Sequence, residues 1–383
     1  MLIRKLITVA LSKKNLKIGV LTSSRADYGI YKQLLLELKQ SKEFDLEIIA
    51  FGMHLDQTHG YTIDEIKINF SKIHTIPGMT ESDSILDISN SYGKLIINFS
   101  NFFQKNKYDF IFAIGDRFEM SAAVQAGIQF KINFVHFHAG ETSLGALDNI
   151  YRHQISLASN IYFVSNKEAK KRLTQILNHE NNIFNVGSIS LNNLDSLKLP
   201  NWKNVCELYD IPSCPFVLVT FHPETVLNSE IELHNIKIIQ SSLIKISKKI
   251  HIVITLPNAD KLSSNYRECF FQLKEKYPNS FSLIKSFGKE NYFSAMKNCK
   301  FLLGNSSSGI IEAASFNKFV INVGNRQKGR CRSKNVIDVE FNEKIIVNQS
   351  MELIASKSFK GKNKYFSKNS VKKVKNVLLN YTN

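Results

Sequence analysis

The sequence predicts an α/β protein made of two doubly wound parallel sheets, one in each half of the chain. Short apolar runs alternate with stretches that have the periodicity of amphipathic helices, a pattern typical of parallel sheets flanked by helices. This alternation stops between Leu197 and Pro215, where three prolines fall, and then begins again. A chain of 383 residues is long enough for two domains with separate cores.

The first half contains five predicted strands. Residues 16–22 form an apolar run of strand length, and residues 28–40 follow with apolar side chains at the spacing of one helix face. Further strands separated by helical patterns predict a series of βαβ units. These strands are expected at residues 46–51, 110–114, 133–137 and 161–164.

The second half is expected to repeat this architecture. Two Rossmann-like domains are therefore predicted, residues 17–198 and 199–365, after an N-terminal extension over residues 1–16. Residues 366–383 are expected to form a basic C-terminal helix that crosses back to the first domain. In the second domain, strands are predicted at residues 216–221, 251–255, 281–284, 301–303 and 319–323, and helices at 230–248, 265–276, 290–298 and 308–316.

The formal net charge of +17 raises the question of a nucleic-acid partner. Eight lysines and no acidic residue lie within residues 357–383, so much of the excess charge belongs to the tail. The sequence contains no helix-turn-helix, RNA-recognition or zinc-knuckle pattern. We therefore expect a solvated basic tail and no nucleic-acid partner.

Membrane and disulfide classes fit the sequence poorly. No apolar run approaches the roughly 18–20 residues needed to cross a bilayer, and the apolar run near the N-terminus is too short for a signal peptide. The five cysteines are scattered and odd in number, which argues against a disulfide framework. We expect no membrane partner and a cytoplasmic location.

Polar residues that follow predicted strands carry the most weight, because ligands of doubly wound sheets bind beyond the carboxyl ends of the strands. Arg25 follows the first strand at the start of a helix, where a guanidinium can meet phosphate. Asp27 is expected to be either the N-cap of that helix or a functional carboxylate. Asp116 directly follows the strand at 110–114 and is expected to point into the cleft, with helix capping as the alternative.

The next strand end and the next helix start add further polar residues. His136 and His138 share one face of their strand, and Glu141 follows after an Ala-Gly turn. Two histidines with one acid are a weak metal pattern, so we expect no metal site. Asp148 and Arg152 are four residues apart on one helix face and can form an ion pair. Carboxylates crowded in a cleft can acquire separated pKa values and divide acid and base roles.

The second half places its strongest signal at residues 304–312, Gly-Asn-Ser-Ser-Ser-Gly-Ile-Ile-Glu. A buried strand runs into a hydroxyl-rich turn that opens a helix, where free N–H groups favour phosphate oxygens. Glu312, one turn later, could accept hydrogen bonds from ribose hydroxyls. His222 and Asn258 each follow a predicted strand, and Arg326 lies in a cation-rich segment after the next one.

Taken together, these segments resemble the hydrolysing UDP-N-acetylglucosamine 2-epimerases of sialic acid and related nonulosonate biosynthesis, a family that includes UDP-N,N′-diacetylbacillosamine 2-epimerases. Single motifs are moderately specific, whereas the ordered set between residues 24 and 330 is strong. The matching motifs are SRADYG (24–29), FGMHLDQTHGYTIDEI (51–66), GDRFE (115–119), HFHAGE (136–141), DNIYRH (148–153), FHPET (221–225), GNSSSGIIEA (304–313) and GNRQKGR (324–330).

The resemblance implies a GT-B-like pair of domains with the active site in the interdomain cleft, a UDP-sugar as substrate, and a homodimer or homotetramer. Many relatives carry glutamate where this chain has His138. Non-hydrolysing relatives have threonine where this chain has Arg117, which favours the hydrolysing branch. The implied catalytic group comprises Asp116, Asp148 and Arg152, with Glu141, His138 and His222. The implied UDP contacts are Arg25, Arg117, His222, Asn258, Ser306, Ser307, Glu312 and Arg326.

The implied reaction converts UDP-N-acetylglucosamine to N-acetylmannosamine and UDP by elimination to a 2-acetamidoglucal and rehydration. It needs no cofactor, because it has no net redox change. UDP-N,N′-diacetylbacillosamine stays open as an alternative substrate for the same chemistry. A GT-B glycosyltransferase, which would need an acceptor, is the alternative of another class, and a non-catalytic nucleotide-sugar sensor is a second.

Overall fold

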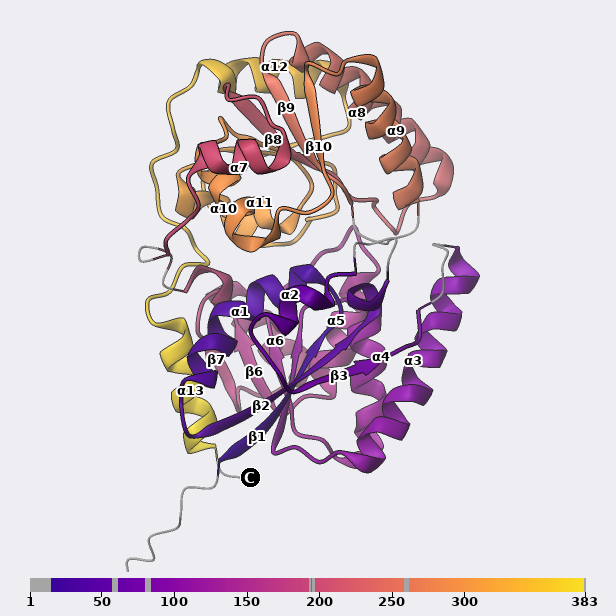
Figure 1. Cartoon of the computed structure of the whole chain (residues 1–383), viewed down its shortest axis with the longest axis vertical. Helices are drawn as coiled ribbons and strands as arrows, with labels where there is room; N and C mark the ends of the chain where they lie inside the picture. The colour runs from indigo at the N-terminus through magenta and orange to yellow at the C-terminus, as the bar shows by residue number, and fades with distance from the viewer. Residues whose placement is uncertain are drawn as a thin grey trace, which may run out of the picture.

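The computed structural model describes residues 15–56, 61–79, 84–192, 194, 197–257 and 262–381. It consists of two lobes, each built around a parallel sheet with helices on its faces (Figure 1). The sheet of the first lobe has the order β3-β2-β1-β4-β5-β6-β7, and that of the second has the order β10-β9-β8-β11-β12-β13. The predicted α/β class with two doubly wound parallel sheets is confirmed.

The first lobe alternates strands and helices as the sequence predicts. Its strands are β1 (Leu16–Thr22), β2 (Phe44–Phe51), β3 (Ile73–Ile76), β4 (Phe110–Ile114), β5 (Phe134–Phe137), β6 (Ile161–Val164) and β7 (Ile183–Asn185). Its helices are α1 (Arg25–Lys39), α2 (Ile63–Lys67), α3 (Ile85–Lys105), α4 (Phe118–Gly127), α5 (Asp148–Leu157) and α6 (Lys167–Leu177), with a 3₁₀ turn, η3, at Ile189–Leu191.

The second lobe begins with α7 (Trp202–Tyr209). One predicted helix, at residues 308–316, is divided here into a short α-helix and a 3₁₀ turn, η5, at Ala313–Phe316. The strands are β8 (Phe216–Thr220), β9 (His251–Thr255), β10 (Phe281–Ile284), β11 (Leu302–Gly304), β12 (Val320–Val323) and β13 (Val336–Val339). The helices are α8 (Ser229–Ser247), α9 (Ser263–Lys276), α10 (Gly288–Asn298), α11 (Ser307–Ile311) and α12 (Glu343–Ala355).

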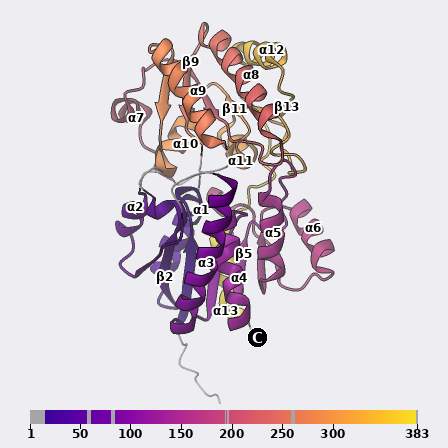
Figure 2. The ribbon, with the colours of Figure 1, turned by 90° about the vertical axis from the view of Figure 1, so that its right-hand side faces the viewer.

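The last helix, α13 (Ser370–Asn380), returns to the first lobe (Figures 1 and 2). Its spacing places Val371, Val374 and Leu378 on one face, and all three are buried in the core of the first sheet. The C-terminal end of the chain therefore completes the lobe that the N-terminal half begins.

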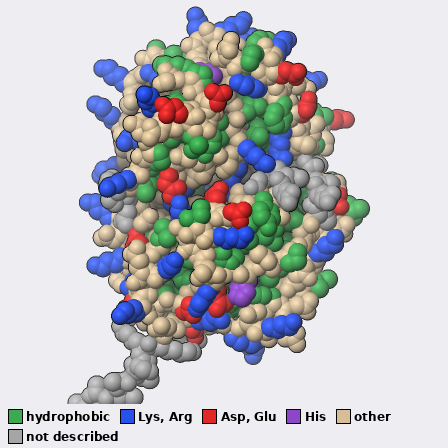
Figure 3. Space-filling model, viewed as in Figure 1, with side chains coloured by type: hydrophobic (Ala, Val, Ile, Leu, Met, Phe, Trp, Pro, Cys, Tyr) green, Lys and Arg blue, Asp and Glu red, His purple; other side chains and the backbone are tan. Residues whose placement is uncertain are grey.

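The face of the molecule seen in Figure 3 carries no single large basic patch. In the view of Figure 3, Lys and Arg side chains are spread over both lobes. Within the described residues, none of the helices has the length and apolar character needed to cross a membrane.

Candidate active site between the two lobes

A cavity of about 480 Å³ lies between the two lobes. It faces the carboxyl ends of β1 and β4 in the first sheet and of β8 and β11 in the second, which are the points where strand order reverses. Doubly wound sheets bind ligands at such points. The predicted site residues that line it are Arg25, Asp116, Arg117, His138, Asp148, Arg152, His222, Ser306, Ser307, Glu312 and Arg326.

The turn after β1 presents Arg25 to the cleft. The N-cap of α1 is Ser24, whose side chain accepts a hydrogen bond from the Asp27 N–H, so the prediction of Asp27 as N-cap is wrong. Asp27 instead lies in the first turn, where its buried carboxylate accepts from the N–H and the hydroxyl of Ser23 at 3.0 and 2.6 Å. Burial raises the pKa of Asp27. The Arg25 guanidinium, at the start of α1, donates to the Lys285 carbonyl of the second lobe.

Arg152 and Asp116 form an ion pair at the wall of the cavity. The Arg152 side chain is 1% exposed, whereas that of Asp116 is 22% exposed. Arg152 also donates to the backbone oxygen of His138 at 3.4 Å. A buried guanidinium thus holds a partly exposed carboxylate toward the cavity, and Asp148 lines the same wall at the start of α5.

His138 follows β5 with a left-handed backbone, at a φ of 60°. Its Nε2 lies 3.3 Å from the Ser188 hydroxyl, and burial lowers its pKa to about 3. His136 stays outside the cavity lining and contacts the Gly115 carbonyl at 2.9 Å and the Ser156 hydroxyl at 3.0 Å. His136 therefore supports the loop that carries Asp116, while His138 reaches the cavity.

Glu141 lies behind the wall of the cavity rather than in it. Its carboxylate accepts hydrogen bonds from Ser165, from Asn166 at 2.6 Å and from the Tyr365 hydroxyl at 3.4 Å. The Arg330 guanidinium lies 3.9 Å away. Glu141 is therefore positioned to orient Arg330, and Arg330 lines the cavity.

A pair of hydrogen bonds joins the two strand ends of the second lobe. The Asn305 side chain accepts from the His222 N–H and donates to the His222 carbonyl, both at 2.8 Å. Asn305 is fully buried, and its own carbonyl accepts from Gln327 at 2.9 Å. His222, the serine turn and the loop after β12 are thereby held around one side of the cavity.

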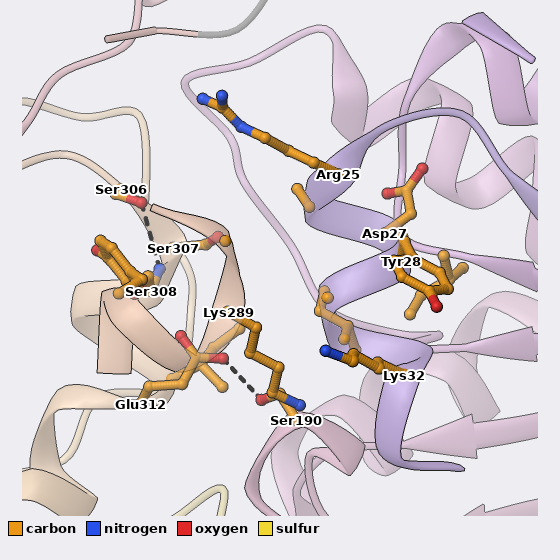
Figure 4. A pocket seen from close by; sticks show the side chains of 18 of the residues that line it. Arg25, Asp27, Tyr28, Lys32, Ser190, Lys289, Ser306, Ser307, Ser308 and Glu312 are labelled. Carbon is orange, nitrogen blue, oxygen red and sulfur yellow. Dashed lines mark hydrogen bonds between the residues drawn. The ribbon is translucent and has the colours of Figure 1, made fainter. Parts of the chain in front are cut away.

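The serine turn opens α11 as the sequence predicts. Ser306 is the N-cap, and its hydroxyl accepts from the Ser308 N–H. The Ser308 hydroxyl donates to the Tyr292 hydroxyl at 3.1 Å. Figure 4 shows these serines and Glu312 on one side of the cavity and Arg25 with α1 on the other.

Glu312 is a buried carboxyl that contacts the first lobe. Ser190 donates to its Oε1 at 2.7 Å across the lobe boundary, the contact drawn in Figure 4. Burial raises the pKa of Glu312 to about 7, although Ser190 and Lys289 oppose that shift. Lys289 has the converse change, because burial lowers its pKa to about 8.

Glu224 shapes the loop that carries Arg326. Its Oε1 accepts hydrogen bonds from the backbone N–H groups of Asn325 and Arg326, at 2.6 and 3.0 Å. Arg326 lines the cavity and donates to the Asn305 carbonyl at 3.4 Å. The motif at 221–225 therefore contributes both His222 and the residue that positions Arg326.

The family of the chain follows from its sequence as a whole. Residues 36–379 match the family model for UDP-N-acetylglucosamine 2-epimerase. The chain belongs to the UDP-N-acetylglucosamine 2-epimerase family. The resemblance seen in the ordered motifs is thereby confirmed at the level of the family.

Two relatives in this family share about a third of their residues with the chain. A GDP/UDP-N,N′-diacetylbacillosamine 2-epimerase (hydrolyzing) of Campylobacter jejuni is 33% identical, covering 90% of this chain and 88% of that protein. A UDP-N,N′-diacetylbacillosamine 2-epimerase (hydrolyzing) of Legionella pneumophila is 34% identical, covering 91% and 92%. The crystal structure of a Neisseria meningitidis UDP-GlcNAc 2-epimerase bound to UDP-GlcNAc shares the fold, with a TM-score of 0.80 at 18% identity, covering 96% and 100%.

Several lining residues of this epimerase-family site were not singled out in the sequence. Lys289 and Tyr292 belong to none of the motifs, although both lie in α10, the helix that follows a predicted strand. Ser190 lies in the 3₁₀ turn η3, which is too short to show a periodic sequence pattern. Arg330 lies inside the motif at 324–330 and could have been found there. Asn258 lies outside the described residues, and among the described residues no cluster of three or more metal-ligating side chains occurs.

Proposed function

We propose that this protein is a hydrolysing 2-epimerase of a UDP-activated 2-acetamido sugar. The observation that carries the proposal is one cavity with two chemically different walls. The first lobe supplies Asp116 and Asp148 beside the buried Arg152, and the second supplies the serine turn and Arg326. Carboxylates serve proton transfer, whereas hydroxyl, N–H and guanidinium donors suit a diphosphate.

The second lobe would hold UDP. The hydroxyls of the serine turn and the first N–H groups of α11 can donate to phosphate oxygens, and Arg25 and Arg326 add positive charge. Glu312, as an acceptor, would take hydrogen bonds from the ribose hydroxyls. This arrangement stabilises the negative charge that gathers on the diphosphate as it leaves C1.

The first lobe would carry out the proton transfers. A carboxylate of the Asp116 and Asp148 pair removes the C2 proton as the C1–O bond to UDP breaks, which gives a 2-acetamidoglucal. Water then adds at C1, and a proton returns to C2 on the opposite face. The products are the free 2-epimeric sugar and UDP. A positioned base of this kind contributes about 10²–10⁴-fold in rate.

We propose UDP-N,N′-diacetylbacillosamine as the preferred sugar, ahead of UDP-N-acetylglucosamine. The support comes from the two relatives at 33% and 34% identity whose names specify that substrate. Both substrates carry the acetamido group and the C2 proton that the chemistry requires, and they differ at C4 and C6. Oligomeric assembly as a homodimer or homotetramer is part of the proposal.

The experiment is turnover in heavy water without added metal or nicotinamide. We expect free sugar with deuterium at C2, together with UDP, and a higher kcat/KM for UDP-N,N′-diacetylbacillosamine than for UDP-N-acetylglucosamine. A product that keeps UDP attached would contradict the hydrolysing assignment. Failure of both sugars to exchange the C2 proton would contradict the epimerase mechanism, and the reverse preference would contradict only the substrate.

A further inference from the structure

A line of hydrogen bonds runs from the first lobe to the second along the wall of the cavity. His138 Nε2 lies 3.3 Å from Ser188 Oγ, Ser188 Oγ lies 2.8 Å from Ser190 Oγ, and Ser190 Oγ lies 2.7 Å from Glu312 Oε1. All four side chains are buried, between 0% and 6% exposed. The line has a titratable group at each end and a hydroxyl at each step between them.

Serine hydroxyls both donate and accept, so such a line can pass a proton without any side chain moving far. The serines are held in register by the backbone, because Ser188 N–H donates to the Tyr365 carbonyl at 2.8 Å and η3 begins one residue later. His138 and Glu312 each line the cavity. Each end of the line can therefore respond to a bound ligand.

We propose that Ser188 and Ser190 form a proton relay that couples nucleotide binding at Glu312 to protonation of His138. The inference rests on the proposed function, which places UDP against Glu312. When Glu312 is protonated, the hydrogen bond with Ser190 has the reverse direction, and the Glu312 O–H donates to Ser190 Oγ. The Glu312 O–H bond breaks as Ser190 accepts its proton, Ser190 passes its own proton to Ser188, and Ser188 passes its own to His138 Nε2. Glu312 ends as a carboxylate, His138 ends as an imidazolium, and both serines remain hydroxyls.

Ligand charge drives the transfer in one direction. Ribose hydroxyls that donate to Glu312 favour its carboxylate, and a diphosphate in the cleft favours the imidazolium. Without nucleotide, burial raises the pKa of Glu312 to about 7 and lowers that of His138 to about 3, so the proton stays on Glu312. Binding reverses both preferences.

Titratable side chains from other parts of the chain lie near each end of this line of hydrogen bonds. Lys289 of α10 and Arg330, after β12, act on Glu312. Arg330 and His136 of β5 act on His138 and disfavour its charged form. A bound diphosphate offsets the positive charge of Arg330, which, after burial, is the next largest cause that disfavours an imidazolium at His138.

The relay gives His138 a specific part in the reaction. Its Nε2 faces Ser188, and no hydrogen bond of its Nδ1 occurs within the described part of the chain. An imidazolium presents an N–H at Nδ1, which can return a proton to the sugar. Ser188 and Ser190 are then positioning residues, since they act only through His138 and Glu312.

The test is ¹⁵N NMR of the full-length protein with labelled histidine, recorded with and without UDP. The His138 signals are assigned by their loss in His138→Gln. We expect UDP to convert His138 from a neutral ring to an imidazolium in the wild type and in Ser190→Thr, and to leave it neutral in Ser188→Ala and Ser190→Ala. Ser242→Ala, which removes a buried hydroxyl from α8, is the matched control and should behave as the wild type.

Turnover provides a second readout. We expect Ser188→Ala and Ser190→Ala to lower kcat roughly 10²-fold, the lower end of what a positioned acid contributes. UDP binding should also weaken, because binding that is coupled to a favourable proton transfer loses that contribution when the transfer is blocked. If UDP still protonates His138 in Ser190→Ala, or leaves it neutral in the wild type, the relay is overturned. Protonation without turnover of any UDP-sugar would keep the relay and overturn the proposed function. A protein that binds no UDP would overturn both.

Discussion

Arg152 is one of the largest fully buried side chains among the described residues, and its ion pair with Asp116 reaches the cavity. A guanidinium in this position fixes the direction of the carboxylate. Asp116 is therefore held toward the cavity on the lobe opposite the serine turn, where the proposed function assigns it to the sugar.

The Asp116→Asn variant separates these roles. The amide keeps an acceptor for Arg152 but cannot remove a proton, so we expect kcat to fall about 10²–10⁴-fold. UDP affinity, measured by calorimetry, should change by less than about threefold. Asp45→Asn is the control, because Asp45 pairs with Lys72 at 2.7 Å on the surface of the same lobe. A loss of UDP binding in Asp116→Asn would contradict the assignment of Asp116 to the sugar.

Glu312 makes the stability of the ligand-free protein depend on pH. Its folded pKa of about 7 lies above the ordinary value of 4.5, so the folded state binds a proton that the unfolded state has lost between these values. Wild-type stability therefore falls as pH rises from about 4.5 to 7. Above pH 7 the ionised Glu312 lowers the free energy of unfolding by its full amount, at most about 3 kcal/mol.

The Glu312→Gln variant removes this cost. We expect the variant to have the higher free energy of unfolding at pH 8 and the same value as the wild type near pH 4.5, measured by urea denaturation without nucleotide. Equal stability at both pH values would show that Glu312 is not held protonated in the folded protein.

The sequence identified those cavity-lining residues that lie shortly after a strand. Arg25, Asp116, His222 and Ser306 follow strands directly, and parallel strands bring their carboxyl ends to one edge. Ser190 could not be found in this way, because its partner Glu312 is 122 residues away and on the other lobe. The pairing of Arg152 with Asp116 likewise depends on how α5 packs against α4, the helix that follows Asp116, and spacing within one helix does not specify this.

Among the elements, the strand ends β8 and β11 are joined closely because one position lacks a side chain. Gly304 has a φ of +144°, and a Cβ there would overlap the backbone of Thr220 in the neighbouring strand. The serine turn begins two residues later. The shape of the cavity wall that the second lobe provides therefore depends on this close approach of β8 and β11.

Gly304→Ala should separate β8 from β11. We expect a loss of roughly 2–4 kcal/mol in the free energy of unfolding, together with weaker UDP binding. Gly93→Ala is the matched control, since Gly93 lies within α3 and a Cβ there would meet nothing within 4 Å. That change should raise stability by up to about 1 kcal/mol through helix propensity. Equal effects of the two substitutions on thermal unfolding would refute the role of Gly304.

The sequence predicted the interior strands and one edge strand, β10, and missed the other three edge strands. β4 and β9 are buried along their whole length, and such apolar runs are visible in the sequence. β3, β7 and β13 have three or four residues each and stay partly exposed, so their sequences lack a continuous apolar signal. Edge strands pair on one side only, and their position is decided by the sheet that they join.

For the whole molecule, the two lobes are linked by more than the segment near residue 200. Lys32 of α1 pairs with Glu290 of α10 at 2.8 Å across the cleft, and Ser188 N–H donates to the Tyr365 carbonyl. The chain then continues from Tyr365 into α13, which is buried in the first lobe. The C-terminal end therefore contributes to the stability of the lobe that carries Asp116.

Shortening a buried side chain of α13 tests this dependence. Leu378 is 1% exposed in the core of the first lobe, so Leu378→Ala should lower the free energy of unfolding by about 2–5 kcal/mol. Lys372→Ala, on the exposed face of the same helix, should change it by less than about 0.5 kcal/mol.

The lining of the cavity contains no residue of α13 within the described chain, so the UDP Kd of both folded variants should stay within about threefold of the wild type. If the basic helix served only as a solvated tail, the two substitutions would have equally small effects on urea denaturation. A large effect confined to Leu378→Ala would instead show that the last helix belongs to the first lobe.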